Sequence, residues 1–216
     1  MNPPRQDPQA STRVLFIRHG EAESNATGKY MGSTDSPLTD LGRRQVNAVA
    51  RRLSRFSIDA LYSSDRGRTM ETATVISSAC ARRVSPDSRL REQDFGRFEG
   101  LTVDEILQAY PDEYAEHKRR GPETAAHGGE SSLQVRDRVA SFVDEIVGRH
   151  PGETVGVVSH GGAMAVTLWG LLEIPYEVTK HVRVGNTGLV EFVRKEDRWI
   201  LERWNDTGHL DGLLSE

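Results

Sequence analysis

The order of strand-like runs and amphipathic segments is the feature that most constrains the fold of this chain. Short runs at residues 14–17, 58–64 and 154–158 are typical of buried strands, and segments with apolar residues at helical spacing follow them. One such segment begins after Thr39, a residue type that caps helices well. Alternation of strands and helices favours a mainly parallel sheet covered by helices on both faces, so we predict an α/β fold.

The chain has the length of one domain. At 216 residues it can bury one sizeable core, and we expect a flexible N-terminal tail at residues 1–12 and a single domain at residues 13–216. Residues 92–130 interrupt the strand–helix order, and we interpret them as an insertion that sets substrate specificity. A long amphipathic helix is predicted from Ser131, and residues 187–204 are typical of a C-terminal hairpin.

Composition restricts the class of protein and its partners. With 36% hydrophobic and 28% charged residues and a net charge of −4, the chain is typical of a globular protein and is not expected to bind nucleic acids or anionic membranes generally. No apolar run approaches the roughly 18 residues of a membrane span. The single cysteine, Cys80, rules out an intrachain disulfide, so we expect a reducing, cytoplasmic location. The C-terminal hairpin leaves an edge at which two copies could form a homodimer.

Two histidines stand where predicted strands end. His19 follows Arg18 in VLFIRHG, His160 ends VGVVSH, and a glycine that we expect to permit a tight turn follows each histidine. Ligands of open parallel sheets bind beyond the carboxyl ends of the strands, and the helix predicted to open at Gly161 to Ala163 adds unpaired N–H groups and a positive dipole end. Leaving Arg18 buried there without an anionic partner would cost about 3–5 kcal/mol. These features predict an anion site, with Arg68 near the end of the next strand as a further cation.

Each of these residues also has a simpler interpretation when it is taken alone. A histidine at a strand end is commonly a buried, hydrogen-bonded core residue. Arg68 could be a solvated charge in the first turn of a helix. The choice between the two interpretations depends on the surrounding motifs.

Seven short motifs occur in the order and approximate spacing of one known family. They are RHGEAESN, GSTDSPLTDLGRRQ, YSSDRGRTMETA, LREQDFGRFEG, GGES, VSHGG and NTG, within the span from Val14 to about Leu210. On these motifs the chain resembles the phosphoglycerate mutase-like branch of the histidine phosphatase superfamily. The resemblance implies a three-layer α/β/α sandwich and a two-step phosphoryl transfer through a phosphohistidine.

The resemblance also implies roles for individual residues. His19 matches the nucleophile, and Glu92 in LREQDFG matches the proton donor, for which Glu99 and Asp94 are the substitutes. The other matches are phosphate-binding positions: Arg18, Arg68 and His160 for the phosphoryl oxygens, with Asn25 and Gly161 beside them.

Elementary chemistry agrees with these roles. A phosphoryl group in transfer carries negative charge that fixed cations stabilise. The same cations disfavour protonation of His19 and keep its imidazole nucleophilic. We expect the pKa of Glu92 to be raised by a partly desolvated setting beside Phe95 and Phe98, as a proton donor requires.

The expected reaction is hydrolysis of a small phosphomonoester without a metal or cofactor. The segment FGRFEG looks like the phosphatase members of the family, but mutase-type phosphoryl transfer and a non-catalytic phosphoester-binding module stay open as alternatives. An α/β-hydrolase is set aside because the sequence has no Gly-x-Ser-x-Gly motif. The other histidines are scattered and no cysteine pair exists, so no metal site is predicted.

The substrate is less constrained than the chemistry. Arg119 and Arg120 lie near the place where mutases of the family have paired arginines for a substrate carboxylate, which suggests a phosphoglycerate or its sugar conjugate. The simpler interpretation is that both are solvated cations at a helix C-terminus. Ala22, Arg66 and Thr69 depart from the residues usual in the family, and these departures bear on substrate detail more than on the phosphate anchors.

Overall fold

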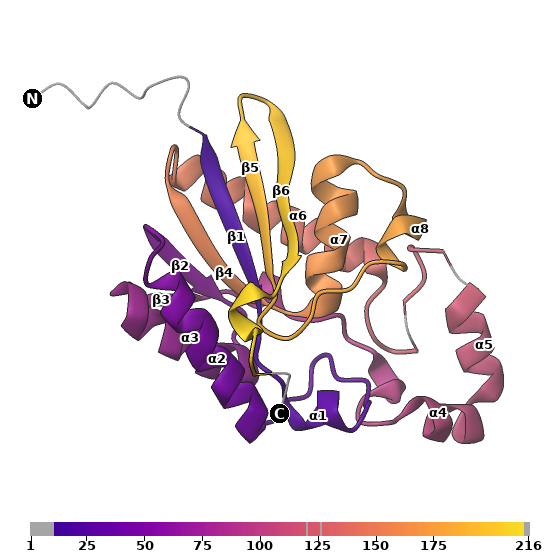
Figure 1. Ribbon diagram of the computed structural model, residues 1–216. Coiled ribbons are helices and arrows are strands. Elements are labelled where there is room, and N and C mark those ends of the chain that lie inside the picture. The colour runs from indigo at the N-terminus through magenta and orange to yellow at the C-terminus, as the bar shows by residue number, and fades with distance from the viewer. Residues whose placement is uncertain (1–10, 120, 126, 214–216) are drawn as a thin grey trace, which may run out of the picture.

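The computed structural model describes residues 11–119, 121–125 and 127–213, and among them six strands form one sheet in the order β3-β2-β4-β1-β5-β6. The strands are β1 (Thr12–Arg18), β2 (Ala60–Ser63), β3 (Val84–Pro86), β4 (Thr154–Ser159), β5 (Leu189–Lys195) and β6 (Arg198–Asp206). The helices are α1 (Glu23–Ala26), α2 (Asp40–Leu53), α3 (Gly67–Cys80), α4 (Val103–Ala109), α5 (Pro111–Arg119), α6 (Ser132–Arg149), α7 (Gly161–Leu172) and α8 (Tyr176–Thr179). Figure 1 shows the sheet between the helices, with α4 and α5 to one side of it.

The sheet is mainly parallel, as predicted. β3, β2, β4 and β1 pair in parallel, and β5 runs antiparallel to both β1 and β6. The C-terminal hairpin is therefore confirmed, with β6 at one edge of the sheet, while a homodimer through that edge stays a prediction. The edge strand β3 was not predicted, because its three residues are too few to show a pattern.

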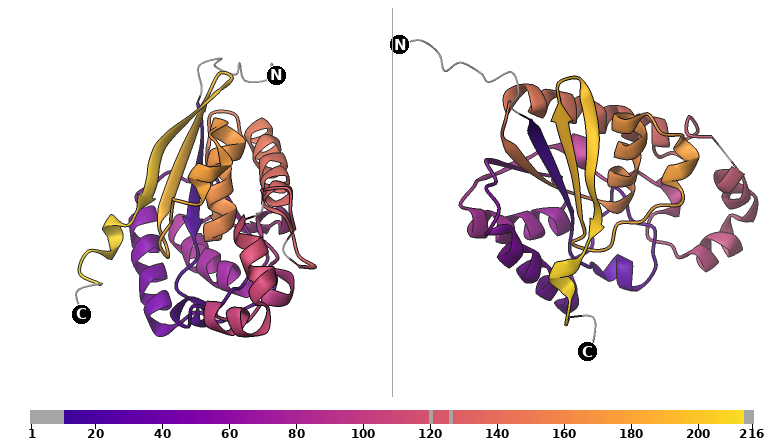
Figure 2. Two further views of the ribbon diagram at one scale, coloured as in Figure 1. Left: turned by 90° about the vertical axis from the view of Figure 1, so that its right-hand side faces the viewer. Right: turned by 45° about the horizontal axis from the view of Figure 1, so that its top comes forward.

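Alternate residues of β1 face two separate cores. Val14 and Phe16 pack in a cluster with residues of α6 and α7, whereas Leu15 and Ile17 pack in a cluster with residues of α2 and α3. Figure 2 shows these helix pairs on opposite faces of the sheet. The three-layer α/β/α architecture is confirmed, and it follows from the strand period of two combined with apolar runs that bury both faces.

Side-chain caps set the starts of α2 and α6, and the cap of α2 was predicted from the sequence. Thr39 accepts a hydrogen bond from the backbone N–H of Gly42 at 2.9 Å and so caps α2. Ser131 caps α6 in the same way, at 3.1 Å from the N–H of Gln134. Both helices therefore begin where the sequence predicted.

The segment between β3 and α6 contains α4 and α5 and packs around one aromatic residue. Phe98 is fully buried, and its ring contacts those of Tyr30, Tyr110 and Tyr114. Tyr30 also pairs with this segment through its backbone, because its N–H donates to Leu101 O at 2.9 Å. These contacts hold α4 near α1, at the end of the sheet where β1 ends (Figure 1).

The start of β1 differs slightly from the expectation. Thr12, which the sequence analysis assigned to the tail, belongs to β1 and is 4% exposed. Its hydroxyl donates to His150 O at 3.0 Å, which ties the start of the strand to the end of α6. Residues 1–10 of the expected tail lie outside the described part of the chain.

Candidate active site

β1 and β4 place two histidines next to each other. These strands are parallel neighbours whose last residues, Arg18 and Ser159, are in register, and the N–H of His19 donates to Ser159 O at 3.1 Å. A histidine follows each strand, so the rings of His19 and His160 lie with their centroids 5.2 Å apart, and both side chains are buried. The structure thus brings together the two histidines that the sequence placed at strand ends.

The tautomer of His19 is fixed by the next residue. Its Nδ1 lies 2.7 Å from Gly20 O, and because a carbonyl oxygen only accepts, Nδ1 carries the proton. Nε2 is therefore the nitrogen with a free lone pair. Burial, followed by the charges of Arg18 and Arg68, lowers the pKa of His19 well below its usual value. The ring is neutral near pH 7, with Nε2 available as a nucleophile.

Gly20 is required for a reason that differs from the expected one. The φ angle of Gly20 lies outside the left-handed region that favours glycine, so the backbone conformation does not explain why glycine is needed here. A Cβ at this position would instead lie 2.7 Å from Gly42 O in α2. Glycine here allows α2 to pack closely against the end of β1.

His160 has a hydrogen-bond partner at only one ring nitrogen among the described residues. Nε2 lies 2.9 Å from the hydroxyl of Ser64, whereas Nδ1 is buried without a partner. Burial, followed by His19 and the nearby arginines, lowers the pKa of His160 well below its usual value. A neutral His160 that accepts the Ser64 hydroxyl at Nε2 has an N–H at Nδ1 for a ligand. Ser64, in the YSS motif, was not predicted as a site residue.

Backbone carbonyls orient the two arginines. Arg18 donates from Nη1 to Val184 O at 2.6 Å, and its Nε is buried without a partner among the described residues. Arg68 is 2% exposed and donates to the carbonyls of Thr34 at 2.9 Å and Gly32 at 3.1 Å. Because carbonyls bear no net charge, these bonds fix the guanidinium groups without neutralising them. Arg68 has one acidic partner as well, an ion pair from its Nη1 to Asp35 Oδ1 at 3.3 Å. The site keeps two oriented cations beside the histidines.

Glu99 holds the loop that positions Arg68. Its carboxylate accepts hydrogen bonds at 2.9 Å from the N–H groups of Gly32, Ser33 and Thr34, and at 2.6 Å from the Thr34 hydroxyl. Burial alone would raise the pKa of Glu99, but these hydrogen bonds outweigh it and lower that pKa. The setting suits a structural anion rather than the substitute proton donor considered from the sequence.

Glu92 lies at the N-terminus of α7. Its carboxylate accepts hydrogen bonds from the N–H of Gly162 at 2.8 Å, of Ala163 at 2.9 Å and of Gln93 at 3.0 Å. A Cβ on Gly162 would lie 2.5 Å from Glu92 Oε1, so the close approach requires glycine. The carboxylate is thereby fixed beside the helix that follows His160.

Two expectations for this region are wrong. The N–H groups at the start of α7 were expected to be unpaired, but Gly162 and Ala163 donate to Glu92. Phe95 and Phe98 were expected to give Glu92 an apolar setting, but both rings pack against Tyr30, and the contacts of the Glu92 carboxylate are backbone N–H groups.

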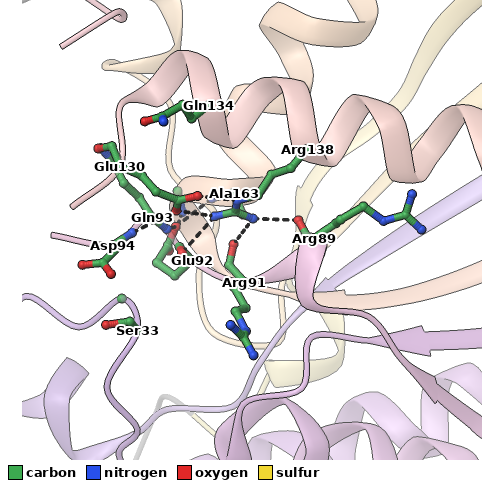
Figure 3. A network of polar contacts seen from close by, with 12 residues as sticks. Ser33, Arg89, Arg91, Glu92, Gln93, Asp94, Glu130, Gln134, Arg138 and Ala163 are labelled. Carbon is green, nitrogen blue, oxygen red and sulfur yellow. Dashed lines mark hydrogen bonds and ion pairs between the residues drawn. The ribbon is translucent and has the colours of Figure 1, made fainter. Parts of the chain in front are cut away.

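Arg138 of α6 fixes the segment that carries Glu92 (Figure 3). Its guanidinium donates to the carbonyls of Arg89 and Arg91, both at 2.6 Å, and of Glu92 at 3.0 Å, and it forms an ion pair with Glu130 at 2.9 Å. One side chain thus satisfies carbonyls that have no regular secondary structure to pair with. Sequence reasoning missed Arg138, because these carbonyls belong to residues 46–49 positions earlier in the chain.

Glu92 lines two cavities. One has a volume of about 350 Å³ and is also lined by Ser33, Arg66 and Arg138, among others. The other has a volume of about 300 Å³ and is also lined by Arg18 and Gly161. Glu92 therefore lines both the smaller cavity, which Arg18 also lines, and the larger cavity beside it.

Asn25 and Gly161 lie at this centre, as the resemblance implies. Asn25 Oδ1 accepts a hydrogen bond at 3.1 Å from Asn186 Nδ2, which also donates to His19 O at 3.2 Å. Gly161 begins α7, and a Cβ on it would lie 3.4 Å from Arg18 Nε. Asn186, in the NTG motif, ties α1 to the end of β1.

Arg119 is not brought into this arrangement. It lies exposed at the end of α5, where its Nε donates to Ala115 O of the same helix at 3.4 Å. It is not among the residues that line either cavity. Arg120, the second member of the expected pair, lies outside the described residues. The carboxylate site expected from this pair therefore gains no support from Arg119.

Metal-binding clusters and membrane-spanning helices are absent from the described residues. No group of three or more His, Cys, Asp or Glu side chains among them is arranged to hold a metal ion. None of the helices described is both long enough and apolar enough to cross a membrane.

Comparisons with known proteins confirm the family resemblance. The family model of the histidine phosphatase superfamily (branch 1) matches residues 14–207. Phosphoserine phosphatase 1 of Hydrogenobacter thermophilus is 32% identical over 204 residues, which cover 94% of this chain and 97% of that protein. Probable phosphoglycerate mutase GpmB of Yersinia pestis is 34% identical over 207 residues, covering 92% and 95%. The structure of mycobacterial glucosyl-3-phosphoglycerate phosphatase with VO3 gives a TM-score of 0.82 at 30% identity, covering 89% of this chain and 98% of that chain.

Proposed function

The chain belongs to the histidine phosphatase superfamily, and from this premise we propose that it hydrolyses a small phosphomonoester, without a metal, through a phosphohistidine at His19. The observation that carries the proposal is a pair of buried polar atoms without partners among the described residues, Arg18 Nε and His160 Nδ1. Both belong to side chains beside the neutral ring of His19. Buried donors of this kind call for an acceptor, and phosphoryl oxygens supply it.

In the first step of the proposed reaction, Nε2 of His19 attacks phosphorus. The N–P bond forms while the P–O bond to the leaving group breaks, and the leaving oxygen takes a proton from the Glu92 carboxyl group. Arg18, Arg68 and His160 donate to the phosphoryl oxygens, so fixed positive charge faces the charge that the transition state spreads over them.

In the second step, water attacks the phosphohistidine. Glu92, now a carboxylate, takes a proton from the water, the N–P bond breaks, and phosphate leaves with His19 neutral again. The N–H groups of Gly162 and Ala163 hold the Glu92 oxygens at the start of α7, where the proton is exchanged in both steps.

We infer that the substrate carries a carboxylate as well as a phosphate. The names of phosphoserine phosphatase and glucosyl-3-phosphoglycerate phosphatase denote substrates with both groups, and these two similar proteins support the same class here. A phosphoglycerate or its sugar conjugate belongs to this class. The likeness to a probable phosphoglycerate mutase favours one second candidate, transfer of the phosphoryl group to an acceptor hydroxyl.

Phosphate release tests the proposal directly. The protein is incubated with p-nitrophenyl phosphate and with 3-phosphoglycerate in EDTA, and inorganic phosphate is measured for the parent, for His19→Ala and for His181→Ala, an exposed histidine as control. We expect turnover by the parent and the control but not by His19→Ala, and an acid-labile phosphoprotein only where His19 is present. Turnover by His19→Ala contradicts the proposed nucleophile. Isomerised 3-phosphoglycerate without phosphate release assigns the mutase reaction instead.

A further inference from the structure

We propose that Arg66 binds the carboxylate of the substrate's leaving group and so determines specificity. The inference rests on the proposed phosphomonoester hydrolysis and adds to it a named residue for the second anionic group. It begins with the larger cavity beside Glu92, which both Arg66 and Glu92 line.

The position of Glu92 indicates where the leaving group lies. A group that protonates the leaving oxygen must lie within hydrogen-bond reach of it, so the remainder of the leaving group occupies space next to Glu92. The cavity of about 350 Å³ meets this condition, and it has room for a small organic acid. Arg66 precedes the first residue of α3, the helix that carries Arg68, so the same helix start presents one cation to the phosphate site and another to the cavity.

The charges around the cavity single out Arg66 among its arginines. Arg91 donates from Nε to Asp65 at 2.7 Å and forms an ion pair with it, and Arg138 pairs with Glu130. In the described part of the chain the Arg66 guanidinium forms no ion pair or hydrogen bond with another residue, and its Nε is buried without a partner. The charge of Arg66 is one of the causes that lower the pKa of Asp65. The two oxygens of that carboxylate, however, already accept hydrogen bonds from Arg91.

A partly buried guanidinium without an anion is poorly solvated, and a planar carboxylate is the group that its fork of donors fits best. Arg183, which lines the smaller cavity, is a weaker candidate for the same task. It lies exposed and donates from Nη1 to Lys180 O at 3.1 Å and to Val182 O at 3.0 Å. The geometry therefore assigns the carboxylate to Arg66.

Two matched substrates and two matched variants test the proposal. 3-Phosphoglycerate and glycerol 3-phosphate share a three-carbon phosphomonoester, but only the first has a carboxylate. We expect Arg66→Met to lower kcat/KM for 3-phosphoglycerate at least about tenfold, mainly through KM, and to change kcat/KM for glycerol 3-phosphate less than about twofold. Arg66→Lys, which keeps the charge without the fork, should restore part of the loss. Arg183→Met should keep the parent's preference for the carboxylate.

Three results overturn the proposal: equal losses of Arg66→Met on both substrates, no preference of the parent for 3-phosphoglycerate, or loss of that preference in Arg183→Met alone. Failure of the proposed reaction is recognised separately, by p-nitrophenyl phosphate turnover and its dependence on His19.

If neither three-carbon substrate turns over, calorimetric titration tests the role of Arg66. Binding of 3-phosphoglycerate that weakens in Arg66→Met, with binding of inorganic phosphate unchanged, supports the role of Arg66. Equal affinity of parent and variant for 3-phosphoglycerate, or no binding of it by the parent, refutes that role.

Discussion

Glu99 and Arg68 hold the same short loop from opposite sides. The Glu99 carboxylate accepts hydrogen bonds from the N–H groups of residues 32–34, while the Arg68 guanidinium donates to the carbonyls of Gly32 and Thr34. The charge of Glu99 also acts favourably on the charge of Arg68. Glu99 takes no part in the proposed reaction, but through this loop it orients Arg68, one of the cations that the reaction uses.

Replacing Glu99 by Gln should reduce both stability and phosphate binding. An amide has one carbonyl oxygen for the loop donors and turns its own N–H groups toward the others, so buried donors lose their acceptor. We expect the free energy of unfolding to fall by about 1–3 kcal/mol in urea titrations. KM for p-nitrophenyl phosphate should rise several-fold because Arg68 is less well fixed. Glu105→Gln, which alters an exposed cap of α4, is the control and should leave KM unchanged. An unchanged KM in Glu99→Gln would show that Arg68 does not depend on this loop.

The strand ends of the site could be predicted from the sequence alone. The continuous apolar runs before His19 and His160 are typical of strands buried on both faces. Neighbouring parallel strands end at the same edge of a sheet. Local chemistry was equally informative for the Thr39 cap, because a cap involves residues only three positions apart.

The surroundings of Glu92 could not be predicted in the same way. Its partners Gly162 and Ala163 lie 70 and 71 positions later in the chain. Arg138, which donates a hydrogen bond to the backbone carbonyl of Glu92, lies 46 positions later. Contacts at such separations follow from the packing of α6 and α7 on the sheet and have no signature in a local pattern. Phe95 and Phe98 lie close to Glu92 in the sequence, which suggested an apolar contact, but both rings pack against Tyr30.

Replacing Arg138 by Lys should reduce both stability and kcat. A lysine ammonium cannot reproduce a planar fork that reaches three carbonyls and the Glu130 carboxylate together. We expect unfolding to be easier by about 2–4 kcal/mol, since buried carbonyls and a partly buried carboxylate lose partners. Because the backbone of Glu92 is then less well fixed, kcat should fall about tenfold or more. Denaturant titration and steady-state kinetics measure the two effects. A stability loss with unchanged kcat would limit Arg138 to a structural role.

Gly162→Ala should impair catalysis although alanine favours helices. The new Cβ would lie 2.5 Å from Glu92 Oε1, so the carboxylate must move away from the start of α7. Displacement of a catalytic group by about 1 Å can cost on the order of 10²-fold in rate, and we expect kcat to fall by that order.

The matched control for this substitution is Gly148→Ala in α6, where a Cβ would meet nothing within 4 Å. It should leave kcat unchanged and raise the free energy of unfolding by about 0.5–1 kcal/mol, because alanine restricts the unfolded chain. Equal kcat values for the two variants would contradict the proposed dependence on the Glu92 position.

The two buried histidines should make the fold less stable in mild acid. Both His19 and His160 have a pKa well below the usual 6.5, chiefly because of burial, so the folded protein does not bind the protons that the unfolded chain binds. Well above pH 6.5 neither state is protonated and the histidines have no effect on stability. As pH falls through that value, the unfolded state gains protons and stability decreases. The two together should cost on the order of 2 kcal/mol between pH 7.0 and 5.5.

His160→Gln isolates half of this pH dependence, because glutamine does not titrate and can keep a hydrogen bond to Ser64. We expect the loss of unfolding free energy between pH 7.0 and 5.5, measured by urea titration at each pH, to be smaller by about 1 kcal/mol in the variant than in the parent. His181→Gln should show the parent's pH dependence, because the side chain of His181 is exposed to solvent. If parent and His160→Gln lose the same amount, His160 is protonated in the folded protein at pH 5.5. The neutral tautomer with a free Nδ1–H donor would then be incorrect in that pH range.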